Sequence, residues 1–186
     1  MIDANSPADL ESRVAELERQ CKALAERTGG QEERCTIVAF SGEMDNLLAC
    51  FNIACGAAAM GLEVEIFFTF WGLNALRRGR TFRGKSIGER MVAMMMPRSS
   101  RTLATSRLNM GGAGPVFFKY LMGRRGVSDL PTLVETAREL GVRFVACEMS
   151  MGVMGIAREE LIEGIDFGGA ATYLDSAARS KVTLFI

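Results

Sequence analysis

The sequence contains no histidine. Catalytic dyads and triads with an imidazole base, and metal sites with histidine ligands, are therefore excluded. Prolines number only four, and aromatic residues make up 8% of the chain. The chain is nevertheless 48% hydrophobic, which excludes intrinsic disorder. Its 186 residues suit one globular domain with an appendage.

The chain also lacks an uninterrupted hydrophobic run long enough to span a bilayer. Its most apolar stretch, LLACFNIACGAAAMGLEVEIFFTFWGL, is interrupted by Asn52, Gly61, Glu63 and Glu65. This pattern predicts a buried helix followed by a buried strand. The N-terminus, MIDANSPADL, carries acidic residues and has no apolar signal-peptide region, so we expect a cytoplasmic protein.

Paired cysteines are absent as well. The five cysteines are an odd number with no CxxC pair, which argues against a disulfide framework and a structural zinc site. On a helix, Cys50 and Cys55 lie about 140° apart and do not share a face. We expect most of these cysteines to be buried, and we expect no bound metal. The cysteines are Cys21, Cys35, Cys50, Cys55 and Cys147.

Residues 1–30 form a predicted N-terminal unit. Within it, apolar side chains alternate steps of four and three residues, which is the spacing of a coiled-coil seam. The seam consists of Leu10, Val14, Leu17, Cys21 and Leu24. We interpret this segment as a self-association helix, and an amphipathic helix packed on its own domain is the alternative. Gly29-Gly30 ends it and leads to the main domain.

Residues 31–186 alternate apolar strand-like runs with amphipathic helical patterns. The expected strands are 35–40, 63–70, 143–150 and 181–186, and the expected helices are 44–60, 129–141, 158–164 and 168–180. This alternation predicts an α/β domain with an open, mostly parallel sheet of about five strands, either flavodoxin-like or Rossmann-like. Helices are expected on both faces of the sheet.

The basic residues are concentrated in one segment. Residues 77–125 carry twelve basic residues and one acidic residue, although the whole chain is neutral, and six methionines lie there too. Three interpretations stay open. The segment is a docking face for an acidic partner or anionic ligand, a contact with an anionic membrane surface, or an oligomer-lining or lid segment whose arginines pair with acids of a neighbouring subunit. Membrane contact would use helices around 88–96 and 115–123. No nucleic-acid-binding module is recognisable.

Two glycine-containing turns lack phosphate-binding fingerprints. The first strand–helix turn, residues 40–45, has no GxGxxG pattern and carries two acids where a pyrophosphate would lie. The glycine-rich loop at 110–115 is not followed by the Lys-Ser/Thr of a P-loop. We therefore expect no cofactor, and the motifs exclude a dinucleotide-dependent oxidoreductase.

Cys147 is the candidate catalytic residue because of its position. It lies at the carboxyl end of an apolar strand, where open α/β sheets place their ligands, and the next turn can start a helix that favours the thiolate. Glu148 would raise the thiol pKa if it faced the sulfur, but strand alternation predicts that it points away. The predicted binding residues are Ser41, Gly42, Thr69, Met149, Ser150 and Met151.

Four stretches of the chain resemble one family. FNIACGAAAMGLEVEIFFTFWGLN, NMGGAGP, ACEMSMGVMGIAREELIEGI and GGAATYL are similar to the DsrE/DsrF-like sulfur-carrier family, in its longer branch with a methionine-rich basic insert. The similarity covers about residues 35–186. It implies a flavodoxin-like subunit, homo-oligomers and a persulfide-carrying cysteine, which maps to Cys147. Related sequences often have a small or hydroxylated residue where this chain has Glu148.

The resemblance also implies partners. Members of this family take part in cytoplasmic sulfur trafficking with rhodanese-type and TusA-type proteins, and some of this branch are regarded as membrane-associated. A sulfur carrier or sulfurtransferase needs one accessible thiolate and no histidine, metal or general base, which fits this composition.

Two alternative functions stay open. One is a non-catalytic oligomeric module that binds a soft metal, an anionic ligand or a membrane surface, and the other is a purely structural assembly subunit. The soft-metal hypothesis rests on Met91, Met94, Met95, Met96, Met149, Met151 and Met154. Plastic core packing is the competing explanation for these methionines.

Overall fold

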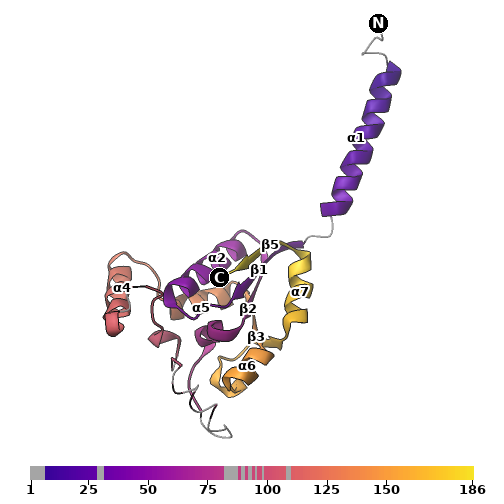
Figure 1. Ribbon diagram of the computed structural model, residues 1–186. Helices are drawn as coiled ribbons and strands as arrows, with labels where there is room; N and C mark the ends of the chain where they lie inside the picture. The colour runs from indigo at the N-terminus through magenta and orange to yellow at the C-terminus, as the bar shows by residue number, and fades with distance from the viewer. Residues whose placement is uncertain are drawn as a thin grey trace. The chain divides into compact units, whose positions relative to one another are not determined.

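The computed structural model describes residues 7–28, 32–81, 88, 91, 94, 96–97, 99–107 and 110–186 (Figure 1). The chain divides into two compact units, Met1–Glu32 and Glu33–Ile186. The first unit contains helix α1, Pro7–Thr28. The division falls two residues after the boundary that the sequence predicts.

The second unit is built on a five-stranded sheet with the order β4-β3-β2-β1-β5. The strands are β1 (Glu32–Ala39), β2 (Glu63–Phe68), β3 (Arg143–Cys147), β4 (Asp166–Gly168) and β5 (Ser180–Phe185). The pairs β1–β2, β2–β3 and β3–β4 are parallel. Ile186 donates to the Val38 carbonyl and accepts from the Phe40 N–H, which is the parallel pattern for β1 and β5. The predicted fold class is confirmed.

Helices cover both faces of this sheet. Helices α2 (Met44–Ala59) and α5 (Leu130–Glu139) pack on one face, and α7 (Ala170–Arg179) lies on the other (Figure 1). Phe51 of α2 meets Phe68 of β2 and Phe144 of β3 at ring-centroid distances of 5.9 and 5.7 Å. Neighbouring strand residues point the other way, so Phe67 and Val145 belong to a smaller cluster with Tyr173 of α7. The two faces of the sheet therefore carry two separate apolar clusters, a large one under α2 and α5 and a small one under α7.

Two expected strands end earlier than their sequences suggest. The strand expected over 63–70 ends at Phe68, and a 3₁₀ helix, η1 (Phe70–Leu76), follows at once. The strand expected over 143–150 ends at Cys147, and α6 (Glu148–Met154) follows it. Apolar residues lie on both sides of each boundary, since Phe70 follows β2 and Met149 follows β3, so composition alone could not reveal where pairing with the neighbouring strand stops.

The region after α6 also differs from expectation. Only residues Arg158–Glu160 of the helix expected over 158–164 are helical, as the 3₁₀ helix η4. The chain then forms the edge strand β4, which the sequence does not predict because it is only three residues long. This edge strand pairs with the end of β3, where Cys147 lies opposite Gly168.

Part of the basic segment is tied to acids of its own chain. The side chains of Arg77 and Glu160 are almost wholly buried and form an ion pair of 2.5 Å, and Arg78 pairs with Glu163 at 2.7 Å. The interpretation that these arginines pair with a neighbouring subunit is therefore wrong for these two. Removing either partner of the buried pair would leave an uncompensated charge in the interior.

A later part of the basic segment, residues 104–106, contacts the first turn of α2. Ser106 hydrogen-bonds the Asp45 carboxylate, and the Met44 N–H donates to the Ala104 carbonyl at 2.8 Å. The helix expected around 115–123 is α4, Ala113–Arg124. The one expected around 88–96 falls largely outside the described residues. Among the described residues, no helix is both long and apolar enough to cross a bilayer.

Candidate functional site

Cys147 lies at the carboxyl end of β3 and is the N-cap residue of α6. Its side chain is 3% exposed and belongs to the cluster of Phe67, Val145 and Tyr173 between the sheet and α7. The backbone bends here from extended to helical, which brings the first amide groups of α6 toward the sulfur. The thiol is thus buried on one side and faced by polar groups on the other.

Hydrogen bonds to the sulfur lower the pKa of Cys147. Burial by itself raises the pKa of this thiol, because it disfavours the charged form. The hydrogen-bonded hydroxyl pair of Ser150 and Thr69, together with the N–H groups of Ser150 and Met149, stabilises the thiolate and outweighs burial. The net pKa of Cys147 lies below that of an ordinary thiol, which favours the nucleophilic form of the cysteine.

The two hydroxyl groups come from different elements and contact each other. The Oγ1 of Thr69 lies 2.8 Å from the Oγ of Ser150, although the residues are 81 positions apart. The Thr69 N–H donates to the Ala39 carbonyl at 3.0 Å, which fixes the chain just beyond β2. Phe70 then takes a left-handed backbone conformation with φ of 44°. Such a conformation in a bulky residue is costly and marks a turn held by its surroundings.

The predicted site residues do not all meet at the sulfur. Met149 and Ser150 contact Cys147 together with Thr69. Met149 is exposed, whereas Met151 is buried in the large core with α2 and α5. The prediction for Met151 therefore has no contact with the thiol to support it.

Ser41 and Gly42 lie at the end of β1 and contact other partners. Ser41 donates to the Glu43 carboxylate and accepts from Asn46 at 2.8 Å. A Cβ added to Gly42 would lie 2.8 Å from the Trp71 carbonyl oxygen, so only glycine allows this close approach. Gly42 thus lets η1, the segment that follows Thr69, approach the end of β1, whereas Ser41 bonds residues at the start of α2.

Glu148 faces away from the thiol, although not for the reason expected. The strand ends before Glu148, so strand alternation does not apply. Its carboxylate instead forms a 2.5 Å ion pair with Arg158, whose guanidinium lies 4.2 Å from the Phe167 ring centroid. Arg158 thus offsets the negative charge next to the candidate nucleophile.

The remaining cysteines lie in different surroundings. All five cysteines are described, and all are free thiols. Cys35 of β1 and Cys50 of α2 are both buried in the core between α2 and the sheet. Burial raises the pKa of Cys35 and, with the neighbouring Cys35, raises the pKa of Cys50 to about 12. Burial also raises the pKa of Cys55, which hydrogen-bonds the Leu133 carbonyl at 3.9 Å. Cys147 alone among these four has a lowered pKa.

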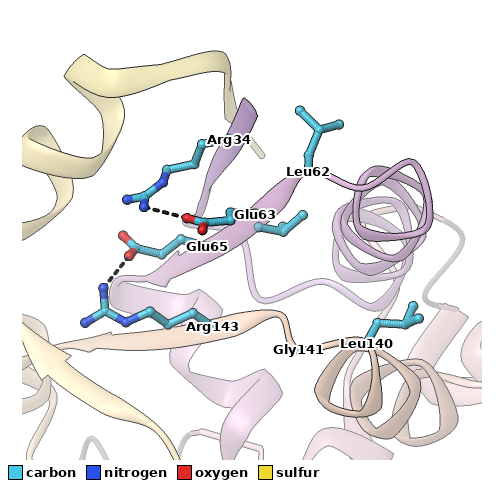
Figure 2. A pocket seen from close by; sticks show the side chains of 8 residues that line it. Arg34, Leu62, Glu63, Glu65, Leu140, Gly141 and Arg143 are labelled. Atoms are coloured by element: carbon cyan, nitrogen blue, oxygen red, sulfur yellow. Dashed lines mark hydrogen bonds and ion pairs between the residues drawn. The ribbon is translucent and has the colours of Figure 1, made fainter. Parts of the chain in front are cut away.

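A pocket of about 380 Å³ lies at the opposite, amino-terminal edge of the sheet (Figure 2). Arg34 pairs with Glu63 at 2.6 Å, and Arg143 pairs with Glu65 at 2.8 Å. Arg143 also pairs with Asp166 at 2.6 Å. These ion pairs join the starts of β1, β2, β3 and β4, so this edge is a charge network that ties strands together.

The soft-metal hypothesis receives little support from the methionines. Met96, Met151 and Met154 are core residues, whereas Met91 and Met94 are exposed. Met95 lies outside the described residues. Within the described part of the chain, no group of three or more cysteine or carboxylate side chains is placed to hold a metal ion.

Sequence reasoning missed two residues that surround Cys147. Phe67 and Tyr173 pack together with a centroid distance of 5.5 Å, and both belong to the Cys147 cluster. Phe67 follows from strand geometry, because it lies opposite Val145, two residues before Cys147 on the same face. Tyr173 is placed by β4, because its helix begins just after Gly168, which pairs with Cys147, and the sequence does not predict that short strand.

Fold and site together define a parallel α/β protein with a hydrogen-bonded thiol at the carboxyl edge of its sheet. The chain belongs to the DsrE/DsrF/DrsH-like family, whose model matches residues 31–185. The match leaves α1 outside and covers nearly all of the second unit.

Proteins similar to this chain include two curated relatives and one solved structure. The uncharacterized protein YrkE of Bacillus subtilis is 45% identical over 84% of this chain and 98% of its own length. The sulfur carrier protein DsrE2 of Allochromatium vinosum is 29% identical over 84% of this chain and 99% of its own length. The crystal structure of the ychN protein from E. coli has a TM-score of 0.52 at 13% identity. It covers 82% of this chain and 98% of that one, which establishes a shared fold.

Proposed function

We propose that the chain is a sulfur carrier that holds sulfane sulfur as a persulfide on Cys147. The observation that carries this proposal is the set of hydrogen bonds that lower the pKa of Cys147. Family membership and the similarity to a protein named as a sulfur carrier support the same function. The absence of histidine from the sequence fits a reaction that needs a thiolate and no general base.

The proposed transfer is a thiol–persulfide exchange. The Cys147 thiolate attacks the outer sulfur of a donor persulfide, R–S–SH. The bond between the two donor sulfurs breaks as the bond to Cys147 forms, and the donor leaves as its thiolate R–S⁻. The outer sulfur keeps its proton, and neither an oxidant nor a reductant is consumed. An acceptor thiolate then attacks the same outer sulfur and restores the Cys147 thiolate.

The hydroxyl groups of Thr69 and Ser150 have two roles in this scheme. They stabilise the attacking thiolate, and after transfer they stabilise Cys147 again when it becomes the leaving group. Because Cys147 is almost wholly buried, the donor approaches from the side of α6, where Met149 and Val153 are exposed. The enclosed sulfur is thereby kept from random thiols in the cell.

Sulfur carriers of this family work with sulfur-relay partner proteins, and we propose rhodanese-type donors and TusA-type acceptors here. Docking at the carboxyl edge is supported by an exposed aromatic group at the ends of β1 and β5. Phe40 stacks on Phe185 at 5.7 Å and meets Phe70 at 5.6 Å, and Trp71 is exposed beside them. Exposed aromatic side chains are enriched where proteins bind each other.

We also propose peripheral association with an anionic membrane surface, through α4, for a protein that otherwise acts in the reducing cytoplasm. Val116, Phe117 and Tyr120 are exposed on this helix, and Arg124 and Arg125 follow at its end. Apolar side chains flanked by cations suit the interface of anionic lipids. Co-sedimentation with phosphatidylglycerol vesicles, but not phosphatidylcholine vesicles, is expected, and Phe117→Asp should abolish it. If wild type and Phe117→Asp sedimented equally with the phosphatidylglycerol vesicles, membrane association through α4 would be contradicted.

The sulfur-carrier proposal is tested by intact-protein mass spectrometry after incubation with polysulfide. Wild type should gain about 32 Da, one sulfur atom, and lose it again on treatment with a reductant. Both proteins carry Cys21→Ser, because the exposed Cys21 thiol would also react with polysulfide, and in this background Cys147→Ser should gain nothing. Cys55→Ser is the matched control, because Cys55 is a less buried thiol outside the site and should leave loading intact. An adduct on Cys147→Ser, or none on wild type, would rule out Cys147 as the carrier.

A further inference from the structure

Helix α1 carries an apolar stripe of side chains that is exposed to solvent. The side chains of residues 11–23 are all exposed, including Val14, Leu17 and Cys21. Val14 and Cys21 are seven residues apart, with Leu17 between them, so the three lie on one stripe of the helix. In heptad notation, Val14 and Cys21 occupy a positions and Leu17 occupies a d position.

The seam residues favour one mode of association. A β-branched residue at a combined with leucine at d favours two-stranded, parallel coiled coils. Glu16 and Arg19 lie at the outer c and f positions and pair with each other at 2.9 Å, so this ion pair lies away from the seam. The stripe of Val14, Leu17 and Cys21 therefore remains as the face that a second helix can cover.

The charges beside the seam select the direction of the second helix. In a parallel pair, a g residue of one helix faces the e residue five positions later on the other. Arg13 at g then faces Glu18 at e, and the two-fold symmetry produces this attractive pair twice. In an antiparallel pair, e positions face each other, and Glu11 would lie against Glu18. The parallel arrangement gains two ion pairs, whereas the antiparallel arrangement brings like charges together.

We propose that α1 binds the α1 of a second copy of this chain as a parallel, in-register, two-stranded coiled coil. This arrangement places the two Cys21 thiols opposite each other in the seam. It defines an interaction surface separate from the family domain, because the family match begins after α1. The proposal does not depend on Cys147 or on sulfur transfer.

Oxidative crosslinking of the full-length chain tests the register. Diamide accepts two electrons and two protons as two Cys21 thiols become one disulfide. A disulfide needs Cα atoms less than about 7 Å apart, which a parallel in-register pair provides. In the antiparallel pairing with Val14 opposite Leu17, the two Cys21 residues would lie about 16 Å apart along the helix axis. Peptide mass spectrometry should find a Cys21–Cys21 link in wild type and lose it in Cys21→Ser.

A charge reversal tests the partner contacts directly. Arg13→Glu places a glutamate opposite Glu18 of the other helix in both symmetric pairs. It should weaken association about tenfold at low salt. The Arg13→Glu/Glu18→Arg double variant restores attraction, and its crosslinking should return to the wild-type level. Arg19→Glu is the matched control, because it changes the same charge at an outward f position.

Three results would overturn the parallel coiled coil. They are the absence of a Cys21–Cys21 peptide, equal crosslinking of Arg13→Glu and wild type, and a double variant that stays as weak as the single one. These positions are exposed and outside the family domain, so the main domain should remain folded in every variant. Sulfur loading, measured on the same samples by intact mass, is a separate readout that reports only on the proposed function.

Discussion

Cys50 and Cys147 are both buried, yet their surroundings change the acidity of their thiols in opposite directions. Cys50 is wholly buried on the core-facing side of α2 among apolar side chains, and its pKa rises to about 12. Cys147 is 3% exposed on the other face of the sheet, and its pKa falls because hydroxyl and amide groups donate to the sulfur. Burial alone therefore does not make a cysteine inert. The donors that accompany burial decide whether the thiolate is stable.

The largest expected difference is in the pH dependence of alkylation. Iodoacetamide should modify Cys147 with a midpoint below pH 9, whereas Cys50 should resist modification until about pH 12. At neutral pH this corresponds to more than about a thousandfold difference in thiolate fraction. Quantitative peptide mass spectrometry across the pH range measures both sites in one sample. If Cys147 and Cys50 were alkylated with the same pH midpoint, hydrogen bonding would not explain a difference in the acidity of the two thiols.

Cys50 should also make the folded state sensitive to alkaline pH. An unfolded cysteine ionises near pH 9, but Cys50 in the folded state keeps its proton up to about pH 12. Its contribution to stability is therefore complete below pH 9 and is lost as the pH rises toward 12. The loss amounts to about 1.4 kcal/mol for each pH unit in this window.

Chemical denaturation of wild type and Cys50→Ala measures this effect as a difference. Cys50→Ala should be less stable at pH 8 because it leaves a cavity, and the gap should narrow by about 2 kcal/mol by pH 10.5. Cys21→Ser removes an exposed cysteine of α1 and should leave the slope unchanged. A gap that stays constant with pH would mean that Cys50 is not held in its protonated form.

The sequence predicts the parts of this contrast that depend on local patterns, but not those that depend on contacts between distant segments. The apolar pattern of 44–60 correctly predicts α2, and the position of Cys147 after an apolar strand correctly predicts the carboxyl edge of the sheet. The contact between Thr69 and Ser150 depends on the pairing of β2 with β3. It also depends on where these two strands end, which the sequence predicts incorrectly. Tyr173 follows Gly168, the β4 partner of Cys147, but the sequence does not predict that three-residue strand and so gives no reason to place Tyr173 near the thiol.

The hydroxyl groups should each account for a smaller part of the difference. Thr69→Val and Ser150→Ala each remove one hydroxyl that stabilises the Cys147 thiolate, and each should raise the pKa of Cys147. The alkylation midpoint and the rate of sulfur loading at pH 7 report this change. Thr36→Val is the control, since the Thr36 hydroxyl bonds Ser180 at 2.6 Å in a fully buried position that belongs to neither the site nor its donors. A midpoint that moves equally in the control would assign the effect to general loss of packing.

Tyr173 should show the smallest effect, because its ring and not its hydroxyl packs on the site. Tyr173→Phe preserves the ring that lies 5.5 Å from Phe67, so stability should change by less than about 0.5 kcal/mol and loading by less than about twofold. Tyr173→Ala exposes the cluster and should raise the alkylation rate of Cys147 without moving its pH midpoint, because the donors from Thr69 and Ser150 remain. A shifted midpoint in Tyr173→Phe would instead identify the phenol as a further donor to the sulfur. The rate and the midpoint thus separate the two things that surround Cys147, the apolar cover and the hydrogen-bond donors.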